Sequence, residues 1–163
     1  MTGVQTCALP IYAERYKLKL QSEYNIHIAQ SCEELAANCN LIITTTPSEI
    51  PLLKSGDINP GTHITAVGSD TSDKQELDSE ILNIADIVVA DSISQSKSRG
   101  EIFRAVQNGS IKEDKPVELG KVIMDKSLQR QNDNQITIVD LTGVAVQDIM
   151  ISQEVYNKYL EGK

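Results

Sequence analysis

The segment Ile64-Thr65-Ala66-Val67-Gly68-Ser69-Asp70 joins an apolar run to two small residues and a carboxylate. The apolar run is typical of a buried strand, and Gly68 with Ser69 allows the backbone to turn tightly or to approach a ligand closely. Asp70 would then stand at the carboxyl end of the strand, the edge at which open α/β sheets bind ligands. The same residues also fit a strand followed by an ordinary polar turn, so the segment alone leaves both interpretations open.

Outward from this segment, strands and helices are expected to alternate. We predict further strands over residues 26–29, 41–45, 87–90 and 136–140, and helices over residues 13–23, 31–37, 78–83, 100–108, 118–124 and 144–160. The run 41–45 is apolar and β-branched, which predicts a strand buried on both faces. The alternation predicts a mostly parallel sheet with helices on its faces. Four polar strand ends would then converge on one edge: Thr46, Asp70, Asp91 and Thr142.

The start of the chain has an unusual composition. Residues 2–11 resemble the translation of a common sequencing adapter, and they lack the basic region and apolar stretch of a signal peptide. We therefore expect residues 1–11 to be an artefactual leader. The natural protein would then extend upstream of Tyr12, and this chain would be a C-terminal fragment.

Composition excludes several functional classes. The formal net charge is -8 and the pI is about 4.7, which argues against binding to nucleic acid or to an anionic membrane. No apolar run approaches the ~20 residues that span a bilayer, so we expect a soluble protein. Cys32 and Cys39 have no nearby metal-ligand partner, which favours a reducing cytoplasmic location and predicts no metal site.

A complete dinucleotide-binding fold should carry G-x-G-x-x-G after its first strand, and this sequence has no such motif. The pattern alone therefore predicts an incomplete, Rossmann-like, doubly wound α/β sheet that lacks its first strand and glycine-rich turn. It predicts no particular chemistry.

Several motifs, taken in order, resemble those of the ornithine cyclodeaminase/mu-crystallin family. They are T-T-T-P-S at 44–48, N-P-G-T-H-I-T-A-V-G-S-D at 59–70 with K-Q-E-L-D at 74–78, A-D-I-V-V-A-D-S at 85–92, E-L-G-K-V at 118–122 and T-G-V-A-V-Q-D at 142–148. The resemblance covers nearly the whole chain from about Ala13 onward.

The resemblance implies a domain plan. Residues 12–143 would form a partial NAD(P)-binding Rossmann domain that also lacks the family's second strand. Residues 144–163 would form a helix that packs on a missing substrate-binding and dimerisation domain. The full-length protein would be a homodimer.

The resemblance also implies roles for individual residues. Asp70 matches the acidic residue proposed as the catalytic acid/base, which would act in a partly buried site. The residues near the cofactor would be Thr46, Val67, Gly68, Ser69, Lys74 and Gly143, and Thr142 would lie near the substrate. The cofactor would be NAD, with NADP left open because the residue that selects between them follows the missing second strand.

The implied activity is an NAD-dependent cyclodeaminase, which converts L-ornithine to L-proline and ammonia by internal hydride transfer. Asp70 favours this branch, because the mu-crystallin and ketimine-reductase branch typically lacks an acid there. The alternatives are an amino-acid dehydrogenase or imine reductase of the same family, and a non-catalytic mu-crystallin-like protein that binds NADPH. The V-G-S-D form at 67–70 also resembles the ectoine-utilisation subgroup. Without the glycine-rich turn, the 163 residues by themselves are expected to be inactive.

Overall fold

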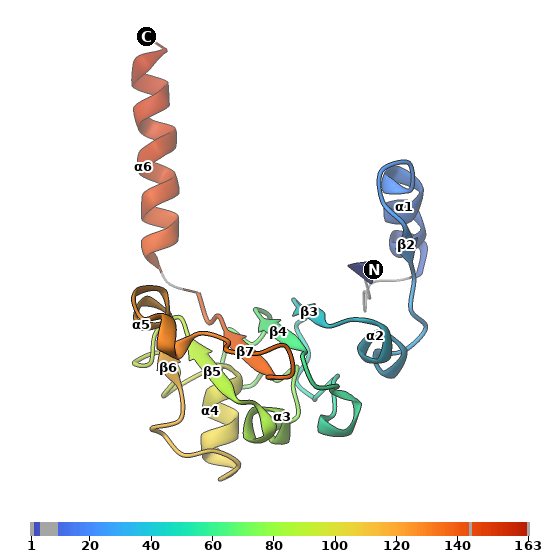
Figure 1. Ribbon diagram of the computed structural model, residues 1–163. Helices are drawn as coiled ribbons and strands as arrows, with labels where there is room; N and C mark the ends of the chain where they lie inside the picture. The colour runs from blue at the N-terminus through green and yellow to red at the C-terminus, as the bar shows by residue number, and fades with distance from the viewer. Residues whose placement is uncertain (1, 4–9, 144, 163) are drawn as a thin grey trace.

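The computed structural model describes residues 2–3, 10–143 and 145–162 (Figure 1). The strands are β1 (Thr2–Gly3), β2 (Ile26–His27), β3 (Leu41–Thr44), β4 (His63–Ala66), β5 (Ile87–Ala90), β6 (Val117–Glu118) and β7 (Thr137–Asp140). The helices are α1 (Pro10–Leu20), α2 (Cys32–Asn38), α3 (Ser79–Ile84), α4 (Gly100–Gln107), α5 (Leu119–Met124) and α6 (Ala145–Glu161). Short 3-10 turns cover Ser55–Asp57 and Lys126–Leu128.

Five strands form one sheet in the order β3-β4-β7-β5-β6, and every pair is parallel. The central register aligns Ile64 of β4 with Ile42 of β3 and with Ile138 of β7. The α/β fold and the mostly parallel sheet predicted from the sequence are therefore confirmed. The last strand in the sequence, β7, lies in the middle of the sheet.

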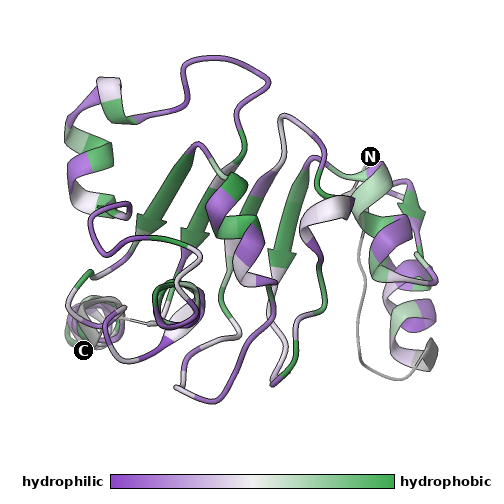
Figure 2. Cartoon of the chain, turned by 90° about the horizontal axis from the view of Figure 1, so that it is seen from below, coloured by the Kyte–Doolittle hydropathy of each residue, from purple (hydrophilic) through white to green (hydrophobic). Residues whose placement is uncertain are grey.

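The core lies between the sheet and the helices α3 and α4, which sit below the sheet in the view of Figure 1. Ile64 and Ile138 project into it from the sheet, and Ile81 and Leu82 meet them from α3; all four are fully buried. Figure 2 shows the apolar character concentrated in the strands, while most connections are polar. This packing holds the strands in position, and with them the strand ends at which the predicted site residues lie.

The β3 strand differs from its prediction. Leu41 is 57% exposed and Ile43 is 62% exposed, whereas Ile42 and Thr44 between them are buried. The prediction of a strand buried on both faces is therefore wrong. β3 lies at the edge of the five-stranded sheet, and among the described residues nothing covers its second face. Val67 also departs from expectation, because β4 ends at Ala66 and leaves Val67 39% exposed.

The two ends of the chain lie apart from the sheet. Near the N-terminus, β1 pairs with β2, and α1 begins at Pro10. Most of the expected leader, residues 1 and 4–9, lies outside the described residues. At the other end, α6 projects away from the sheet (Figure 1). Val144, where that helix was expected to begin, also lies outside them.

The surface of α6 is rich in exposed apolar side chains. They are Ile149, Met150, Ile151, Val155, Tyr156, Tyr159 and Leu160. Among the described residues, no helix combines the length and apolar character needed to cross a membrane.

Candidate functional site

The carboxyl ends of β3 and β4 enclose a shallow hollow of about 290 Å³, which we call the edge hollow. Its lining residues are Thr45, Thr46, Pro47, Val67, Gly68, Asp70 and Lys74. Five of them are residues that the sequence singled out. The hollow thus joins the T-T-T-P-S segment to the V-G-S-D segment, which lie about 20 residues apart in the chain, because parallel pairing brings both strand ends to one edge.

Asp70 and Lys74 form the charged side of the edge hollow. The Lys74 Nζ donates to Asp70 Oδ1 over 2.6 Å, an ion pair between residues four apart. This hydrogen bond holds the pKa of the Asp70 carboxyl below its usual range. The Asp70 side chain is 54% exposed, so in this chain it stands at the surface rather than in the partly buried site expected from the sequence.

Gly68 lines the edge hollow, and Ser69 lies next to it in the chain without lining the hollow. A Cβ on Gly68 would collide with the Thr46 carbonyl and lie 2.5 Å from Glu76 Oε1, so no side chain fits there. The close approach predicted for Gly68 is therefore made to the protein's own chain. Ser69 is buried, and its hydroxyl donates to the Lys74 carbonyl over 2.8 Å, which closes the 69–74 loop. Ser69 does not line the hollow.

Thr142 and Gly143 lie at a second place on the same edge, beyond the end of β7. The Thr142 hydroxyl donates to Asp91 Oδ1 over 3.1 Å, and the Gly143 amide donates to Asp91 Oδ2 over 3.0 Å. Gln95 Oε1 lies 3.3 Å from the same hydroxyl. The structure thus divides the predicted residues into two groups, and neither Thr142 nor Gly143 lines the edge hollow.

Three buried carboxyl groups behind this edge were not predicted. Glu76, Glu101 and Asp140 are almost fully buried. Glu101 accepts from the amides of Glu76 (2.7 Å) and Leu77 (3.2 Å), and Asp140 Oδ2 accepts from the Ile102 amide (2.9 Å). The sequence draws attention to two of these three acids, because Glu76 lies inside the K-Q-E-L-D motif and Asp140 ends a predicted strand.

Burial changes the acidity of two of these groups. Desolvation, reinforced by the charge of Asp140, raises the pKa of Glu101 to about 8. Desolvation likewise raises the pKa of Asp140 to about 7, with Asp91 adding to the effect. Near neutral pH the Glu101 side chain therefore favours the neutral acid, and Asp140 titrates in this range, because a buried charge without a counter-ion is costly.

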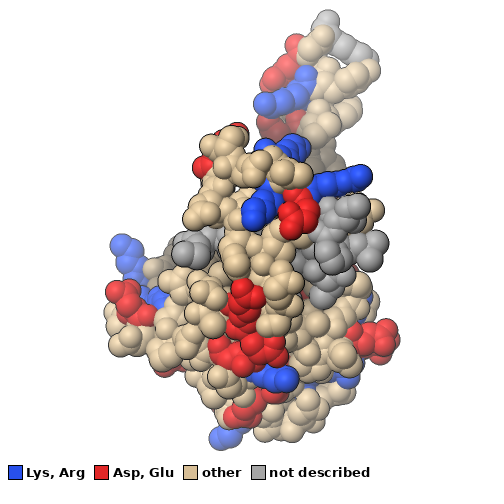
Figure 3. All heavy atoms as spheres, turned by 90° about the vertical axis from the view of Figure 1, so that its right-hand side faces the viewer, with Lys and Arg blue, Asp and Glu red and all other residues tan. Residues whose placement is uncertain are grey.

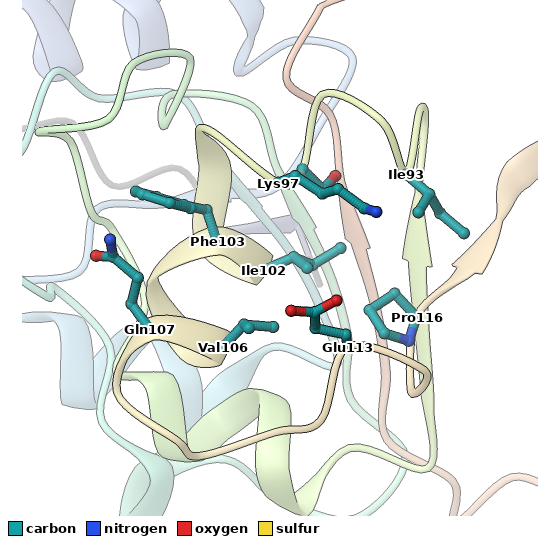
Figure 4. Close-up of a pocket in the computed structure, with 9 residues that line it drawn as sticks. Ile93, Lys97, Ile102, Phe103, Val106, Gln107, Glu113 and Pro116 are labelled. Carbon is teal, nitrogen blue, oxygen red and sulfur yellow. The ribbon is translucent and has the colours of Figure 1, made fainter.

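A separate cavity of about 340 Å³ lies beside α4 (Figure 4). Its lining is mostly apolar, with Lys97, Gln107 and Glu113 among the polar members. None of the predicted site residues lines it. Within the part of the chain that the structure describes, no group of three or more His, Cys, Asp or Glu residues is placed to hold a metal ion.

The charge distribution bears on possible partners. On the face shown in Figure 3, acidic side chains gather in the lower central part. Basic side chains gather higher up on the same face, while the formal net charge of the whole chain is -8.

Comparison with known proteins places these features in context. A family described as "Ornithine cyclodeaminase/mu-crystallin family" matches residues 7–163. The alanine dehydrogenase of Archaeoglobus fulgidus is 46% identical over 132 residues, which cover 80% of this chain and 40% of that protein. This chain spans less than half the length of the curated relatives it matches.

Solved structures show the same fold. An archaeal alanine dehydrogenase dimer with bound NAD matches with a TM-score of 0.88 and 33% identity, over 98% of this chain and 49% of that one. The Thermococcus litoralis Δ1-pyrroline-2-carboxylate reductase, in complex with NADH and L-proline, matches with a TM-score of 0.88 and 28% identity, over 98% and 50% of the two chains.

Proposed function

Because this chain belongs to the ornithine cyclodeaminase/mu-crystallin family, we propose that it forms part of an NAD-dependent enzyme that interconverts an α-amino acid and its α-imine. The observation that carries the proposal is the edge hollow, where Thr46, Gly68, Asp70 and Lys74 meet at the carboxyl ends of two parallel strands. Strand ends of this kind are where Rossmann-like sheets bind dinucleotides.

The edge hollow suits part of a dinucleotide. At about 290 Å³ it can take a ring and its sugar rather than the whole cofactor. Gly68 lets the turn after β4 lie directly against Thr46 and Glu76, which forms one wall of the hollow. The chain has no G-x-G-x-x-G turn for the pyrophosphate. When bound, NAD would supply the hydride acceptor in one direction and NADH the donor in the other. NADP is the alternative cofactor.

Asp70 would move the proton. An amino acid binds with its α-nitrogen protonated, and that nitrogen must lose a proton before the α-carbon can release a hydride. The proposed acceptor is the Asp70 carboxylate, which lines the edge hollow and is held in place by Lys74 at 2.6 Å. The lowered pKa keeps Asp70 ionised but makes it a weaker base, so the proposal rests on its position. Thr142 is proposed to lie near the substrate and Gly143 near the cofactor, with Asp91 fixing the positions of both.

The fate of the imine separates two candidate activities. If water adds, the imine gives an α-oxo acid and ammonia, which is a dehydrogenase reaction. If the substrate is ornithine, its δ-amine adds instead, ammonia leaves, and reduction of the cyclic imine returns the hydride to give proline. The 46% identity to an alanine dehydrogenase favours the first activity, and the carboxylate of Asp70, suited to position a second amine, favours the second.

The decisive experiment compares two substrates. The protein, expressed from the complete reading frame in which this chain occurs, is given NAD+ with L-alanine or with L-ornithine. Equal amounts of NADH and ammonia from alanine identify a dehydrogenase, whereas proline and ammonia without net NADH identify a cyclodeaminase. Binding of the dinucleotide without turnover of either substrate would favour the non-catalytic alternative.

The role of Asp70 is tested in the same assay. Asp70→Asn should lower kcat by roughly 10²-fold or more, because the proton acceptor is lost. Asp73→Asn is the matched control: Asp73 is an exposed acid on the same loop that does not line the edge hollow. Equal activity of the two variants would contradict the proposed role.

We also propose that the full-length enzyme is a cytoplasmic homodimer. The alanine dehydrogenase neighbour is a dimer, and α6 presents an apolar surface that suits burial against further protein.

A further inference from the structure

Glu76 joins the ends of two strands from a fully buried position. Its side chain is 0% exposed. The Glu76 Oε1 accepts from the Thr46 hydroxyl (2.7 Å) and from the Thr46 amide. The Oε2 accepts from the Thr44 hydroxyl (2.6 Å) and from the Gly68 amide (2.9 Å). One carboxylate therefore holds both the end of β3 and the turn after β4.

The four hydrogen bonds suit the two oxygens of a carboxyl group, each of which accepts from one backbone amide and one threonine hydroxyl. The amides of Thr46 and Gly68 can only donate, and one of them faces each oxygen of Glu76, so both oxygens must accept. A glutamine in the same place would turn an NH₂ group towards one of these two amides, and neither group could accept. Hydrogen bonds to a charged acceptor are also stronger than hydrogen bonds between neutral groups.

Glu76 is itself held from α4. The Glu101 carboxyl group accepts from the Glu76 amide over 2.7 Å and from the Leu77 amide over 3.2 Å. The Glu76 backbone is therefore anchored to a core helix through its amide, and its carbonyl also accepts from the Leu52 amide over 2.7 Å. The chain of contacts runs from α4 through Glu76 to two residues that line the edge hollow, Thr46 and Gly68.

We infer that Glu76 is a positioning residue of the dinucleotide site: it fixes the spacing between Thr46 and Gly68 and so shapes the edge hollow without lining it. This inference rests on the proposed function, because the ligand of the hollow is the dinucleotide assigned there.

The first test uses Glu76→Gln in the protein expressed from the complete reading frame. We expect the KM for NAD+ to rise about tenfold or more, and kcat to change much less, because the variant distorts the hollow and leaves Asp70 in place. Leu82→Ala is the control, since Leu82 is buried in α3 away from the hollow and its loss lowers the melting temperature through the core alone. A similar rise of KM in both variants would overturn the inference.

A double-mutant cycle tests whether Glu76 acts through Thr46. Thr46→Val removes the hydroxyl that donates to Glu76 while preserving shape. If the two residues act as one unit, the changes in KM from Glu76→Gln and Thr46→Val will not multiply in the double variant. Fully multiplicative changes would overturn the inference.

Hydrogen exchange supplies a measurement that needs no activity. In Glu76→Gln, the amides of Thr46 and Gly68 should exchange faster than in the wild type, while in Leu82→Ala these two amides should show no selective loss of protection. Unchanged exchange at both amides in Glu76→Gln would overturn the inference even in an active enzyme. Absence of NAD-dependent turnover in the wild type would instead count against the proposed function, with the exchange result still deciding the role of Glu76.

Discussion

At the scale of single residues, the buried acids Glu101 and Asp140 link stability to pH. Their pKa values in the folded protein are about 8 and about 7, above the ordinary values of 4.5 and 3.8. When the pH lies between a group's ordinary pKa and its pKa in the folded protein, the folded state binds more protons than the unfolded chain. The free energy of unfolding therefore decreases as pH rises through this range. We expect the melting temperature to fall by several degrees between about pH 6 and about pH 8.5, measured by calorimetry.

Amide variants provide the control for this pH dependence. Asp140→Asn and Glu101→Gln cannot titrate, so each should flatten the fall in melting temperature across the same pH range. Asp140 is the cleaner choice, because within the described part of the chain its Oδ1 atom has no hydrogen-bond partner to lose. A slope identical to that of the wild type in both variants would show that other groups cause the pH dependence.

The burial of Glu76 and Glu101 could not be predicted from the sequence, for one physical reason. Charged side chains are mostly exposed in proteins, so composition alone gives no reason to place Glu76 or Glu101 in the core. Their burial depends on amide donors that only the folded chain brings together. Asp70 could be predicted because it follows a strand directly, whereas Lys74 was expected only from the family resemblance and its contact with Asp70 was not predicted.

At the scale of an element, α4 depends on the glycine at its first position. Gly100 has a φ of +92°, and a Cβ there would lie 2.5 Å from Asp140 Oδ2 and 2.6 Å from the Thr142 Cγ2 atom. Gly100→Ala should therefore lower the free energy of unfolding by about 3 kcal/mol, from backbone strain and overpacking together. Denaturant unfolding measures the loss.

Gly109 provides a matched control for this element. Its φ of +75° carries the same backbone strain, but a Cβ added there would meet no atom of the described residues within 4 Å. Gly109→Ala should cost only about 1 kcal/mol. Equal losses in the two variants would mean that the packing against Asp140 contributes nothing.

The length of an element largely determined whether the sequence could predict it. The four-residue strands of the main sheet and the longer helices follow from runs of apolar residues, and their ends fall within a few residues of expectation. β6 is only Val117–Glu118, too short for any alternation of apolar and polar residues, and its Glu118 is the first residue of the helix that the sequence predicts over residues 118–124. For β3, composition predicted the strand correctly but not its edge position, which depends on the other strands of the sheet.

At the scale of the whole molecule, exposed apolar surface governs solution behaviour. β3 is the edge strand of the sheet, and its exposed face carries Leu41 and Ile43. The helix α6 adds a second apolar surface. We expect the isolated 163-residue chain to self-associate with rising concentration, as unprotected sheet edges do. Light scattering after size-exclusion chromatography measures this.

A lysine at the open edge should weaken that association. Ile43→Lys places a charge on the exposed face of β3, where pairing with a second chain would bury it. Ile50→Lys is the control, because Ile50 is 71% exposed but lies in a connection outside the strands. If both variants associate as the wild type does, the edge of β3 is not the contact.

The central position of β7 has a consequence for the biosynthesis of the protein. β3 and β4 pair with each other, as do β5 and β6, and residues 137–140 join the two pairs into one sheet. While a ribosome is still making the earlier residues, the nascent chain can hold only two unconnected pairs of strands with their inner edges open. The sheet is therefore completed only after residues 137–140 have been translated, and until then the inner edges of both pairs are open to wrong pairing.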